Sequence, residues 1–342
     1  MKTYSKKLIN KAGEILILKR SVTRDKRIEL FLESFNILNF FRSRHSFPLN
    51  IIQNGLRRFA CGIDKQAVIS QRLKRAPSVI NKLKRYPTMS LIRMQDIAGC
   101  RAVLKNIEQV KKCAKKLKES RMRHILKRED DYILSPKSSG YRSYHLVYEY
   151  VSDRNTTYNG LRIEIQLRTK LQHSWATAVE TIGTFLKSSL KSSEGSDEWL
   201  YFFSLVSAIF ADKEKSPLSR DIKMEKKELL EKIKQLSKKL EVEEKLNMYR
   251  TMLKVTRDSM SKKMKYVLLA LDINARKLTL TGFLDKDKAN KEYLEHEKKY
   301  ADNSMIDIVL VSTESIRTLA LAYPNYFLDT GYFLEQLKEI CE

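Results

Sequence analysis

The most constraining feature of this sequence is a short stretch in which apolar and polar residues alternate without interruption. In it the apolar residues Leu161, Ile163, Ile165 and Leu167 alternate with the polar residues Arg162, Glu164, Gln166 and Arg168. A period of two places successive side chains on opposite faces of a β-strand. The sequence therefore predicts a strand with one apolar face and one charged face, although the solvent-exposed face of an antiparallel sheet would give the same pattern.

Strands and helices alternate around this stretch. A strand-like segment surrounds Gly99 at 95–104, and a basic amphipathic helix is predicted at 107–123. A second strand begins at Tyr144, and a helix follows the alternating stretch at 170–186. This order indicates an α/β layer, and we predict an α+β fold in which helices flank a mixed β-sheet.

The first 85 residues read as helices. Predicted helices cover 24–42 and 49–59, and a third begins near Lys65 and is interrupted by Pro77, which restarts a helix that ends near Arg85. The basic residues in and around this last part are Arg72, Lys74, Arg75, Lys82, Lys84 and Arg85. No acidic residue lies between Lys74 and Arg93, so we favour an anion site over a solvated charged face.

The rest of the chain predicts a helical connector and a small α+β module. An apolar segment at 199–211 is too short to span a membrane and reads as a buried helix that closes the first domain. After it come, in order, a helix or helical pair at 221–261, strands at 266–273 and 276–283, a helix at 286–300, a strand at 305–312, and helices at 314–322 and 331–340. The predicted domains are 1–215, 216–262 and 263–342.

The charge of the chain indicates a polyanionic partner. The sequence has 66 basic and 41 acidic residues, a net charge of +25, which suits RNA, DNA, a nucleotide or an acidic surface, or serves only solubility. The four cysteines form no CxxC pair and read as reduced thiols of a cytoplasmic protein. No run of about 18 apolar residues and no signal-peptide cleavage site are found, so we expect neither export nor a membrane span.

Two acidic residues, Asp96 and Glu164, lie on or beside predicted strands that can be neighbours. Carboxylates are natural ligands of Mg²⁺, which takes one or two protein acids together with substrate phosphates. Donors suited to phosphate oxygens accompany them in the same signatures: Lys137, Arg142, His145, Gln166 and Arg168. Tyr141 follows Gly140 and either offers its ring to a base or belongs to the core. Ordinary packing or surface positions are expected for His173, Trp175 and Glu180.

Three signatures, QDIAGCR, DYILSPKSSGYRSYH and EIQLRTKLQHSWA, resemble those of the RelA/SpoT-type synthetase domain. The resemblance covers roughly residues 66–186 and implies a nucleotidyltransferase-like fold that moves pyrophosphate from ATP to a ribose 3′-hydroxyl. The segment before it has a single histidine, His45, and no His-Asp pair, so no hydrolase-type metal motif precedes the match. A member with synthetase activity alone is implied.

The resemblance also implies roles for individual residues. Arg72 and Arg101 would hold the adenine of ATP between two guanidinium planes, and Asp96 would bind Mg²⁺. Glu164 would bind metal or take the proton from the attacking hydroxyl. Contacts to phosphates would come from Lys74, Lys82, Lys137 and His145. Tyr141 would stack on the base of the acceptor, and Gln166 would help to orient it.

One departure concerns the acceptor. Ser139 stands before Gly140 where relatives that make alarmones usually have Asn, and the high positive charge also favours a larger polyanion. The chain therefore resembles toxic members that modify the 3′ end of tRNA. The C-terminal segment resembles that of the fused toxin and antitoxin proteins called CapRel, in which a Tyr-x-x-Tyr motif, here Tyr323 and Tyr326, enters the ATP site until a phage major capsid protein releases it. The alternatives are a (p)ppGpp synthetase that uses GDP or GTP and a non-catalytic RNA-binding protein.

Overall fold

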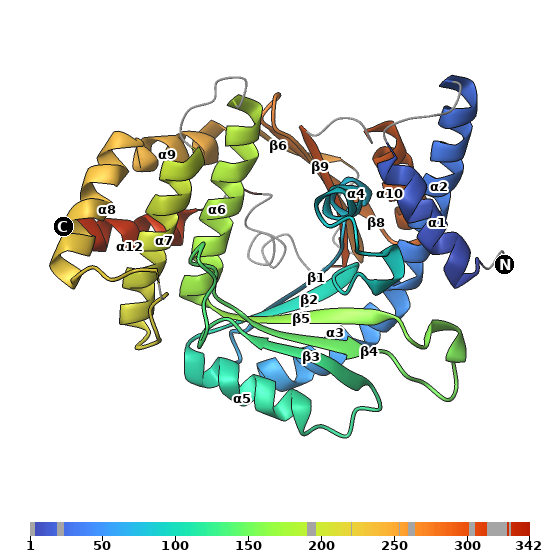
Figure 1. Ribbon diagram of the computed structural model, residues 1–342, viewed down its shortest axis with the longest axis horizontal. Helices are drawn as coiled ribbons and strands as arrows, with labels where there is room; N and C mark the ends of the chain where they lie inside the picture. The colour runs from blue at the N-terminus through green and yellow to red at the C-terminus, as the bar shows by residue number, and fades with distance from the viewer. Residues whose placement is uncertain are drawn as a thin grey trace.

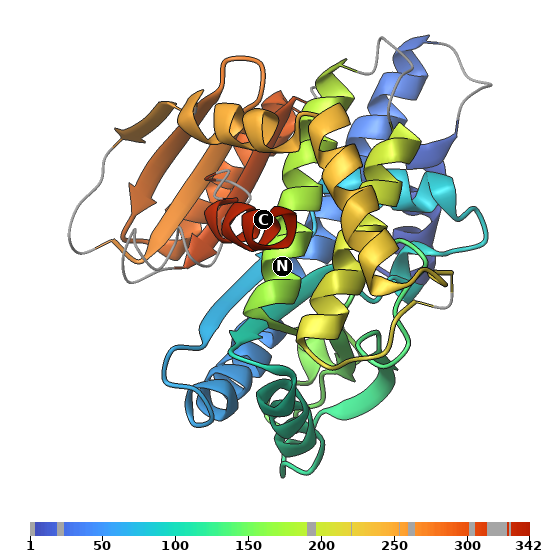
Figure 2. The same cartoon turned by 90° about the vertical axis from the view of Figure 1, so that its left-hand side faces the viewer.

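The computed structural model describes residues 4–18, 24–189, 196–219, 221–252, 254–258, 264–300, 305–312, 327 and 330–342. In Figure 1 a twisted sheet forms the floor of the molecule, a group of helices stands at its left end, and a second sheet lies behind its right end. Figure 2, turned by 90°, shows the second sheet and the helical group side by side above the first sheet.

The first sheet contains the predicted alternating stretch. Its strands are β1 (Val68–Leu73), β2 (Ala98–Leu104), β3 (Ile125–Asp131), β4 (Tyr144–Glu149) and β5 (Arg162–Thr169). They lie in the order β1-β2-β5-β4-β3, and only the β2–β5 pair is parallel. The prediction of a mixed sheet flanked by helices is confirmed.

Two helices cover one face of this sheet, α3 (Ser46–Cys61) and α5 (Ile107–Lys118). Under them lie Ile163, Ile165 and Leu167, the apolar residues of β5, all inaccessible to solvent. Burying such a side chain contributes about 1.5–3 kcal/mol, so this apolar row fixes which face of β5 points inward. Its polar residues therefore point to the opposite face, as the alternation predicted.

The remaining helices of the first 215 residues pack at the two ends of the sheet and above its polar face. They are α1 (Lys6–Ile17), α2 (Arg24–Arg44), α4 (Ala76–Arg85), the 3-10 turns η1 (Leu91–Arg93) and η2 (Thr156–Tyr158), α6 (Lys170–Ser189) and α7 (Ser196–Lys213). In Figure 1, α4 and α6 stand on the same side of the sheet, above opposite ends of the strands. No helix in the described ranges is both long enough and apolar enough to cross a membrane.

A second, smaller sheet follows the helical connector. Its strands are β6 (Lys254–Asp258), β7 (Tyr266–Asp272), β8 (Lys277–Phe283) and β9 (Ile306–Ser312), in the order β6-β8-β7-β9. The predicted hairpin around Asn274 is present as the antiparallel pair β7–β8. Helix α10 (Lys286–Lys299) covers one face through Tyr293, and the other face holds a separate apolar cluster.

The last helix leaves this sheet and joins the helical group. That group contains α8 (Lys226–Lys239), α9 (Val242–Met252) and α12 (Gly331–Cys341) together with α6 and α7. The helical conformation is interrupted between α8 and α9 at Glu241, which has a φ of 51°. The connector is therefore a pair of helices and not one long helix. Phe333 of α12 packs against Phe203 and Phe210 of α7, so the buried helix at 199–211 shares its core with the C-terminus.

Three predicted helical segments differ from the structure. The expected helix from Lys65 is strand β1, because the β-branched Val68 and Ile69 suit a strand and its backbone pairs with β2. Helix α5 ends at Lys118, and β3 follows as an edge strand whose residues are mostly polar, which leaves no alternation to detect. The helix expected to reach Ser261 ends at Met252, before β6. The helix predicted at 314–322 lies outside the described residues.

Candidate active site

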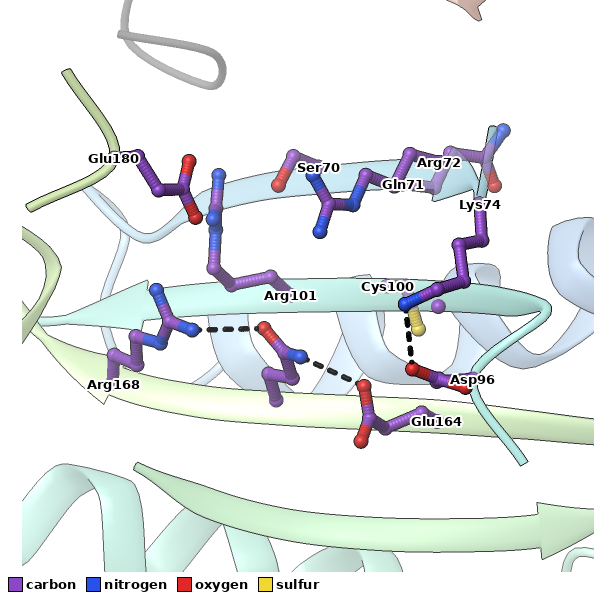
Figure 3. Close-up of a pocket in the computed structure, with 12 residues that line it drawn as sticks. Ser70, Gln71, Arg72, Lys74, Asp96, Cys100, Arg101, Glu164, Arg168 and Glu180 are labelled. Carbon is purple, nitrogen blue, oxygen red and sulfur yellow. Dashed lines mark hydrogen bonds and ion pairs between the residues drawn. The ribbon is translucent and has the colours of Figure 1, made fainter. Parts of the chain in front are cut away.

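An open pocket lies on the polar face of the first sheet (Figure 3). Its empty space, including solvent at its mouth, is about 730 Å³. The lining residues come from β1, β2, β5, α6 and the segments before β2 and after β1; they are Ser70, Gln71, Arg72, Lys74, Asp96, Gly99, Cys100, Arg101, Glu164, Gln166, Arg168 and Glu180. Asp96, Glu164, Arg72 and Arg101, far apart in sequence, thus meet at one site.

The strand register explains this gathering. Arg72 lies opposite Gly99 on β2, and Gly99 lies opposite Glu164 on β5. Two residues further along β2, Arg101 lies opposite Gln166. Because residues two apart share a face, these two rows across the sheet place their side chains on the same side.

Gly99 lies between Arg72 and Glu164 in the first of these rows and adds no side chain to the floor of the pocket. A Cβ atom at this position would lie 3.3 Å from the backbone oxygen of Glu164 and 3.9 Å from its Oε2 atom. Any side chain here would therefore press on the neighbouring strand and stand between Arg72 and Glu164. The glycine of the QDIAGCR signature is explained by this close approach.

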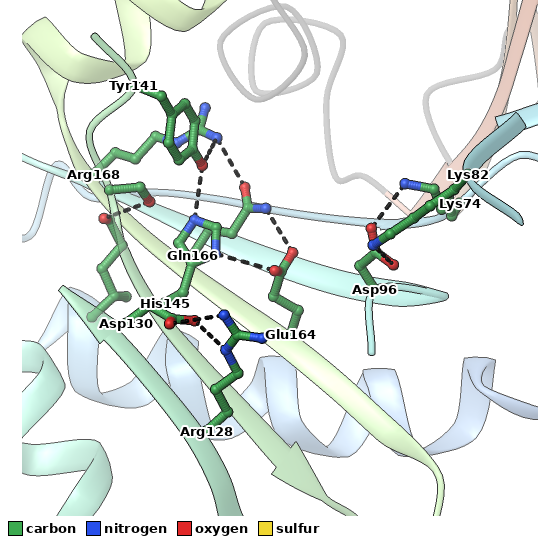
Figure 4. A network of polar contacts seen from close by, with 12 residues as sticks. Lys74, Lys82, Asp96, Arg128, Asp130, Tyr141, His145, Glu164, Gln166 and Arg168 are labelled. Carbon is green, nitrogen blue, oxygen red and sulfur yellow. Dashed lines mark hydrogen bonds and ion pairs between the residues drawn. The ribbon is translucent and has the colours of Figure 1, made fainter. Parts of the chain in front are cut away.

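Asp96 is held by two lysines, and we call these three residues the Asp96 cluster (Figure 4). The Lys74 Nζ atom lies 2.9 Å from Oδ2, and the Lys82 Nζ atom lies 2.8 Å from Oδ1. Burial raises the pKa of the Asp96 carboxyl group, but the two ammonium groups outweigh that effect, so its pKa lies below the ordinary value. Asp96 is thus an ionised carboxylate whose two oxygens face cations.

Glu164 is held by a different kind of partner. Its Oε1 atom lies 3.1 Å from His145 Nδ1, and its Oε2 atom accepts a hydrogen bond of 2.7 Å from Gln166 Nε2. Burial raises the pKa of Glu164, but the hydrogen bond and charge of His145 outweigh it, and the pKa lies below the ordinary value. A carboxylate that is ionised in this way is better suited to hold a cation than to accept a proton at neutral pH.

The contacts of Glu164 continue to Tyr141, and we call the connected set His145, Gln166, Arg168, Tyr141 and Glu164 the Glu164 network (Figure 4). The Tyr141 hydroxyl lies 2.8 Å from His145 Nε2 and accepts a hydrogen bond of 2.8 Å from Arg168 Nη2. Arg168 Nη2 also donates to Gln166 Oε1 at 3.1 Å. The tyrosine is half-buried, with its hydroxyl fixed in this network.

The loop that carries Tyr141 is anchored from behind by α7. Ser207 Oγ donates a hydrogen bond of 2.5 Å to the Gly140 carbonyl oxygen. Gly140 has a φ of +85°, and a Cβ atom there would lie 2.8 Å from the Cβ of Ser207. Both the backbone conformation and the contact with α7 therefore require glycine.

Arg142 belongs to this anchor, not to the pocket. It is almost fully buried and donates to Ser207 Oγ, Ser216 Oγ and the Ile133 carbonyl oxygen. Burial lowers its pKa to about 10. The sequence-based prediction of a phosphate contact for Arg142 is wrong, because its guanidinium group faces α7.

The other predicted residues divide into three groups. Lys82 joins the site through Asp96, while Lys137 lies beside the network, with its Nζ atom 5.3 Å from the centre of the Tyr141 ring. His173 and Trp175 are buried, as expected for packing residues. Tyr323 and Tyr326 lie outside the described residues.

Several lining residues were missed by the sequence analysis: Ser70, Gln71, Gly99, Cys100 and Glu180. Ser70 shares a face with Arg72 on β1, so reading this segment as a strand would have found it. An ordinary packing or surface position was expected for Glu180, and its exposed side chain lies at the wall formed by α6.

The donor set is compatible with a hard cation such as Mg²⁺. No cluster of three or more His, Cys, Asp or Glu side chains that could hold a metal ion occurs within the described ranges. Two ionised carboxylates that line one pocket nevertheless match an ion that takes one or two protein acids and completes its shell with phosphates and water. Lys74 and Lys82 would then turn from Asp96 to those phosphates.

The mixed sheet and its pocket define a class of site: a pocket in which basic side chains surround two carboxylates, a combination suited to phosphate groups. Residues 71–183 match the model of the region found in RelA and SpoT proteins. This part of the chain is similar to that region, and it contains Arg72, Asp96, Arg101 and Glu164.

Individual relatives match about a third of this chain. It is 33% identical over 111 residues to GTP pyrophosphokinase YjbM of Bacillus subtilis (strain 168), covering 32% of this chain and 52% of the relative. It is 32% identical over 111 residues to GTP pyrophosphokinase YwaC of the same organism, covering 31% of this chain and 52% of the relative. The chain thus spans about half the length of these relatives.

Among solved structures, a GTP pyrophosphokinase family protein from Streptococcus pneumoniae is similar, with 25% identity and a TM-score of 0.42. The similarity covers 51% of this chain and 88% of that chain.

Proposed function

We propose that this chain is an ATP-dependent pyrophosphokinase that modifies the 3′-hydroxyl of the tRNA 3′ end and thereby blocks translation in the cytoplasm. The observation that carries the proposal is the meeting of Asp96, Glu164, Arg72 and Arg101 in one pocket within the RelA/SpoT-type region. The high net charge of +25 and Ser139 before Gly140 favour tRNA as the acceptor.

In the proposed reaction the acceptor 3′-oxygen forms a bond to the β-phosphorus of ATP, and the bond between that phosphorus and the bridging oxygen of AMP breaks. AMP leaves with the electron pair, and the hydroxyl proton passes to water.

Arg72 and Arg101 hold the adenine, and Lys74, Lys82 and Lys137 contact phosphates. His145, whose two ring nitrogens contact Glu164 and Tyr141, positions these two residues instead of contacting phosphates. Tyr141 stacks on the acceptor base, and Gln166 orients the acceptor. Alignment and neutralisation of charge are the chief contributions expected of such a site.

Mg²⁺ would be held by Asp96 and Glu164 and would neutralise charge on the transferred phosphates. The lowered pKa of Glu164 favours this role over that of a general base. Asp96 remains ionised beside Lys74 and Lys82. Both carboxylates could therefore bind Mg²⁺ without first releasing a proton.

We further propose that the C-terminal part keeps the enzyme inactive through Tyr323 and Tyr326 until a phage major capsid protein binds. The placement of the described elements supports this regulation. Strand β9 lies beside β1, which lines the pocket, and α12 packs against α6, which lines it from the other side. The C-terminal part thus contacts both walls of the site.

The second candidate function is a (p)ppGpp synthetase with GDP or GTP as acceptor, which the names of the two relatives favour. A single experiment separates the candidates. The full chain and its Tyr323→Ala variant are incubated with γ-labelled ATP, tRNA and GDP, with and without phage lysate. Label in tRNA supports the first proposal, and label in a guanosine nucleotide supports the second. RNA binding without release of AMP would indicate a non-catalytic RNA-binding protein.

The regulatory proposal is tested by toxicity in growing cells. Tyr323→Ala or Tyr326→Ala should make the chain toxic, whereas Tyr332→Ala, an exposed tyrosine of α12, should not. Point variants are preferable to truncation after residue 215, because truncation would expose Phe203 and Phe210, which pack against Phe333. Harmless Tyr323 and Tyr326 variants in a chain that transfers label would contradict the regulatory proposal alone.

A further inference from the structure

Helix α5 presents a row of lysines to solvent on the side of the sheet opposite the pocket. These lysines are Lys111, Lys112, Lys115, Lys116 and Lys118, and the single acid within the helix is Glu108. Its apolar residues are buried against the sheet, so the helix needs no further protein partner for its apolar face. We call this row the α5 lysine face.

Few acids balance this face. Among the described residues, Lys111, Lys112 and Lys116 form no ion pair, and Lys115 reaches Glu119 only at 3.8 Å. Lys118 is bound to Glu129 on β3 at 2.7 Å. Three adjacent ammonium groups therefore remain available to a polyanion.

Helix α8 is an equally basic helix in another part of the molecule. It has six lysines and two glutamates against five lysines and one glutamate in α5, so the two helices carry the same net charge. In each helix two lysines form ion pairs, which in α8 are Lys226 with Asp212 and Lys239 with Glu198. The two helices therefore differ in position and not in charge: α5 covers the first sheet, whereas α8 packs in the helical group.

The α5 lysine face lies next to the β3 edge of the sheet, which leads to an aromatic pair beside the pocket. At this edge the acids Glu129 and Asp130 are paired with Lys118 and Arg128. Strand β3 is the last strand of the sheet, and Lys118 connects α5 to it through Glu129. Tyr132 follows β3 directly, and its ring centre lies 6.0 Å from that of Tyr141. The Nζ atom of Lys137, an exposed residue, lies 4.5 Å from the centre of the Tyr132 ring. Aromatic rings combined with cations are typical of sites that stack the bases of single-stranded nucleic acid.

We propose that the α5 lysine face binds the phosphate backbone of the acceptor RNA, and that its single-stranded 3′ end passes the β3 edge and stacks a base on Tyr132. This inference rests on the proposed function and assigns the body of the RNA to a surface outside the pocket. It makes Tyr132 a second stacking residue next to Tyr141. RNA is favoured over an acidic protein because the basic face leads to partly exposed aromatic rings at the site of 3′-hydroxyl chemistry.

The first test measures binding of tRNA to the full chain at several salt concentrations. In the α5 variant, Lys111, Lys112, Lys115 and Lys116 are changed to Ala; in the control, Lys227, Lys234, Lys238 and Lys239 of α8 are changed to Ala. We expect the α5 variant to bind tRNA about tenfold or more weakly, with a smaller slope of log K against log salt, by roughly 0.7–0.9 for each lost phosphate contact. The α8 variant should stay within about twofold of the wild type.

The second test separates the two parts of the surface. Tyr132→Leu should weaken binding of tRNA with an intact 3′ end by about fivefold or more, and should leave binding of the same RNA without its unpaired 3′ nucleotides unchanged. Circular dichroism spectra and unfolding temperatures of all variants report directly on whether they fold. A folded Tyr132 variant that loses affinity for both RNAs would contradict the stacking role.

The inference and the proposed function fail in different ways. Equal loss in the α5 and α8 variants, or wild-type binding by the α5 variant, overturns the RNA surface even where label is transferred to tRNA. A chain that binds tRNA through α5 but labels only GDP overturns the tRNA acceptor and with it the 3′-end path. Equal competition by an acidic polypeptide such as poly-glutamate at the same charge concentration overturns the preference for RNA.

Discussion

The two carboxylates of the pocket are held in opposite ways. Asp96 is paired with two full positive charges, those of Lys74 and Lys82, whereas Glu164 is hydrogen-bonded to the side chains of His145 and Gln166. Both have a pKa below the ordinary value. In the Asp96 cluster two cations therefore share one carboxylate, and our proposed function assigns these cations to the phosphates of ATP. The Glu164 network fixes the other carboxylate in place.

The Asp96 cluster and the Glu164 network are also held in place by different parts of the chain. Arg42 Nε of α2 donates a hydrogen bond of 2.7 Å to the Lys74 carbonyl oxygen, and Arg42 itself is buried in an ion pair with Glu297 of α10. The neighbouring Arg75 pairs with Asp307 of β9 at 3.0 Å. The Asp96 cluster is therefore connected to the C-terminal sheet, whereas the Glu164 network is supported by α7 behind Gly140.

The largest effect is expected from removal of either carboxylate. Asp96→Asn and Glu164→Gln keep the size of the side chain but remove its charge, so transfer of label from ATP should fall by about 100-fold to 10,000-fold. Rates of AMP release measure this loss. Glu180→Gln, which changes an exposed wall residue of the same pocket, should lose less than about tenfold. Equal loss in all three variants would mean that the two carboxylates have no special role.

The brace of the Asp96 cluster is tested by Glu297→Ala. This change leaves the Arg42 guanidinium group buried without its charged partner, and we expect a loss of about 3–5 kcal/mol in the free energy of unfolding. Denaturant unfolding measures it, with Glu295→Ala as control, because the exposed Lys291–Glu295 pair should contribute no more than about 0.5 kcal/mol. We also expect weaker ATP binding, since Arg42 holds the Lys74 backbone. Unchanged stability in Glu297→Ala would show that the ion pair does not persist in solution.

The brace of the Glu164 network is tested by Gly140→Ala. The new methyl group meets Ser207 and the residue has a φ of +85°, so we expect a loss of about 1–3 kcal/mol. Gly160→Ala is a matched control, because Gly160 also has a φ of +85° but has no atom within 4 Å of the added Cβ. It should lose about 1 kcal/mol from backbone conformation alone. Equal losses in the two variants would argue against a tight contact between the loop and α7.

The smallest effect that we expect is a change in the pH dependence of stability at acidic pH. Both carboxyl groups have lower pKa values in the folded protein than their ordinary values of 3.8 and 4.5. The unfolded chain therefore binds protons first, and the stability that these groups contribute is present above the ordinary values and is lost as the pH falls below them. As the pH is lowered through these ordinary values, the unfolding temperature should fall less steeply in Asp96→Asn than in the wild type. An identical pH profile would show that Asp96 is not stabilised as an anion.

Much of the first sheet could be predicted from local patterns. The alternation around Glu164 defined β5 and its polar face, because period two has one simple structural meaning. The same reasoning failed for β1 and β3. Both are edge strands, and β3 has few apolar residues. Their strand conformation depends on hydrogen bonds to partner strands, and for β1 this partner is about 30 residues away in sequence.

Prediction of the site was likewise uneven. Asp96, Glu164 and the nearby hydrogen-bond donors suited to phosphate oxygens were predicted from their residue types and from the three signatures. Arg142 was misassigned because its sequence neighbours, Tyr141 and His145, do belong to the Glu164 network, and only the position of α7 shows which way its guanidinium group points. Glu180 was not predicted to line the pocket, because a single acidic residue on a helix has no distinguishing sequence pattern.

The sequence by itself determined the charged face of β5 and identified Asp96 and Glu164, with basic side chains near them, as candidate site residues. Tertiary structure alone decided that Lys74 and Lys82 share Asp96, that α7 holds the Tyr141 loop, and that α10 reaches Arg42 over 251 residues or more along the chain. The physical reason is range: side-chain periodicity acts between neighbours, whereas ion pairs and packing join residues whose separation along the chain leaves no local trace.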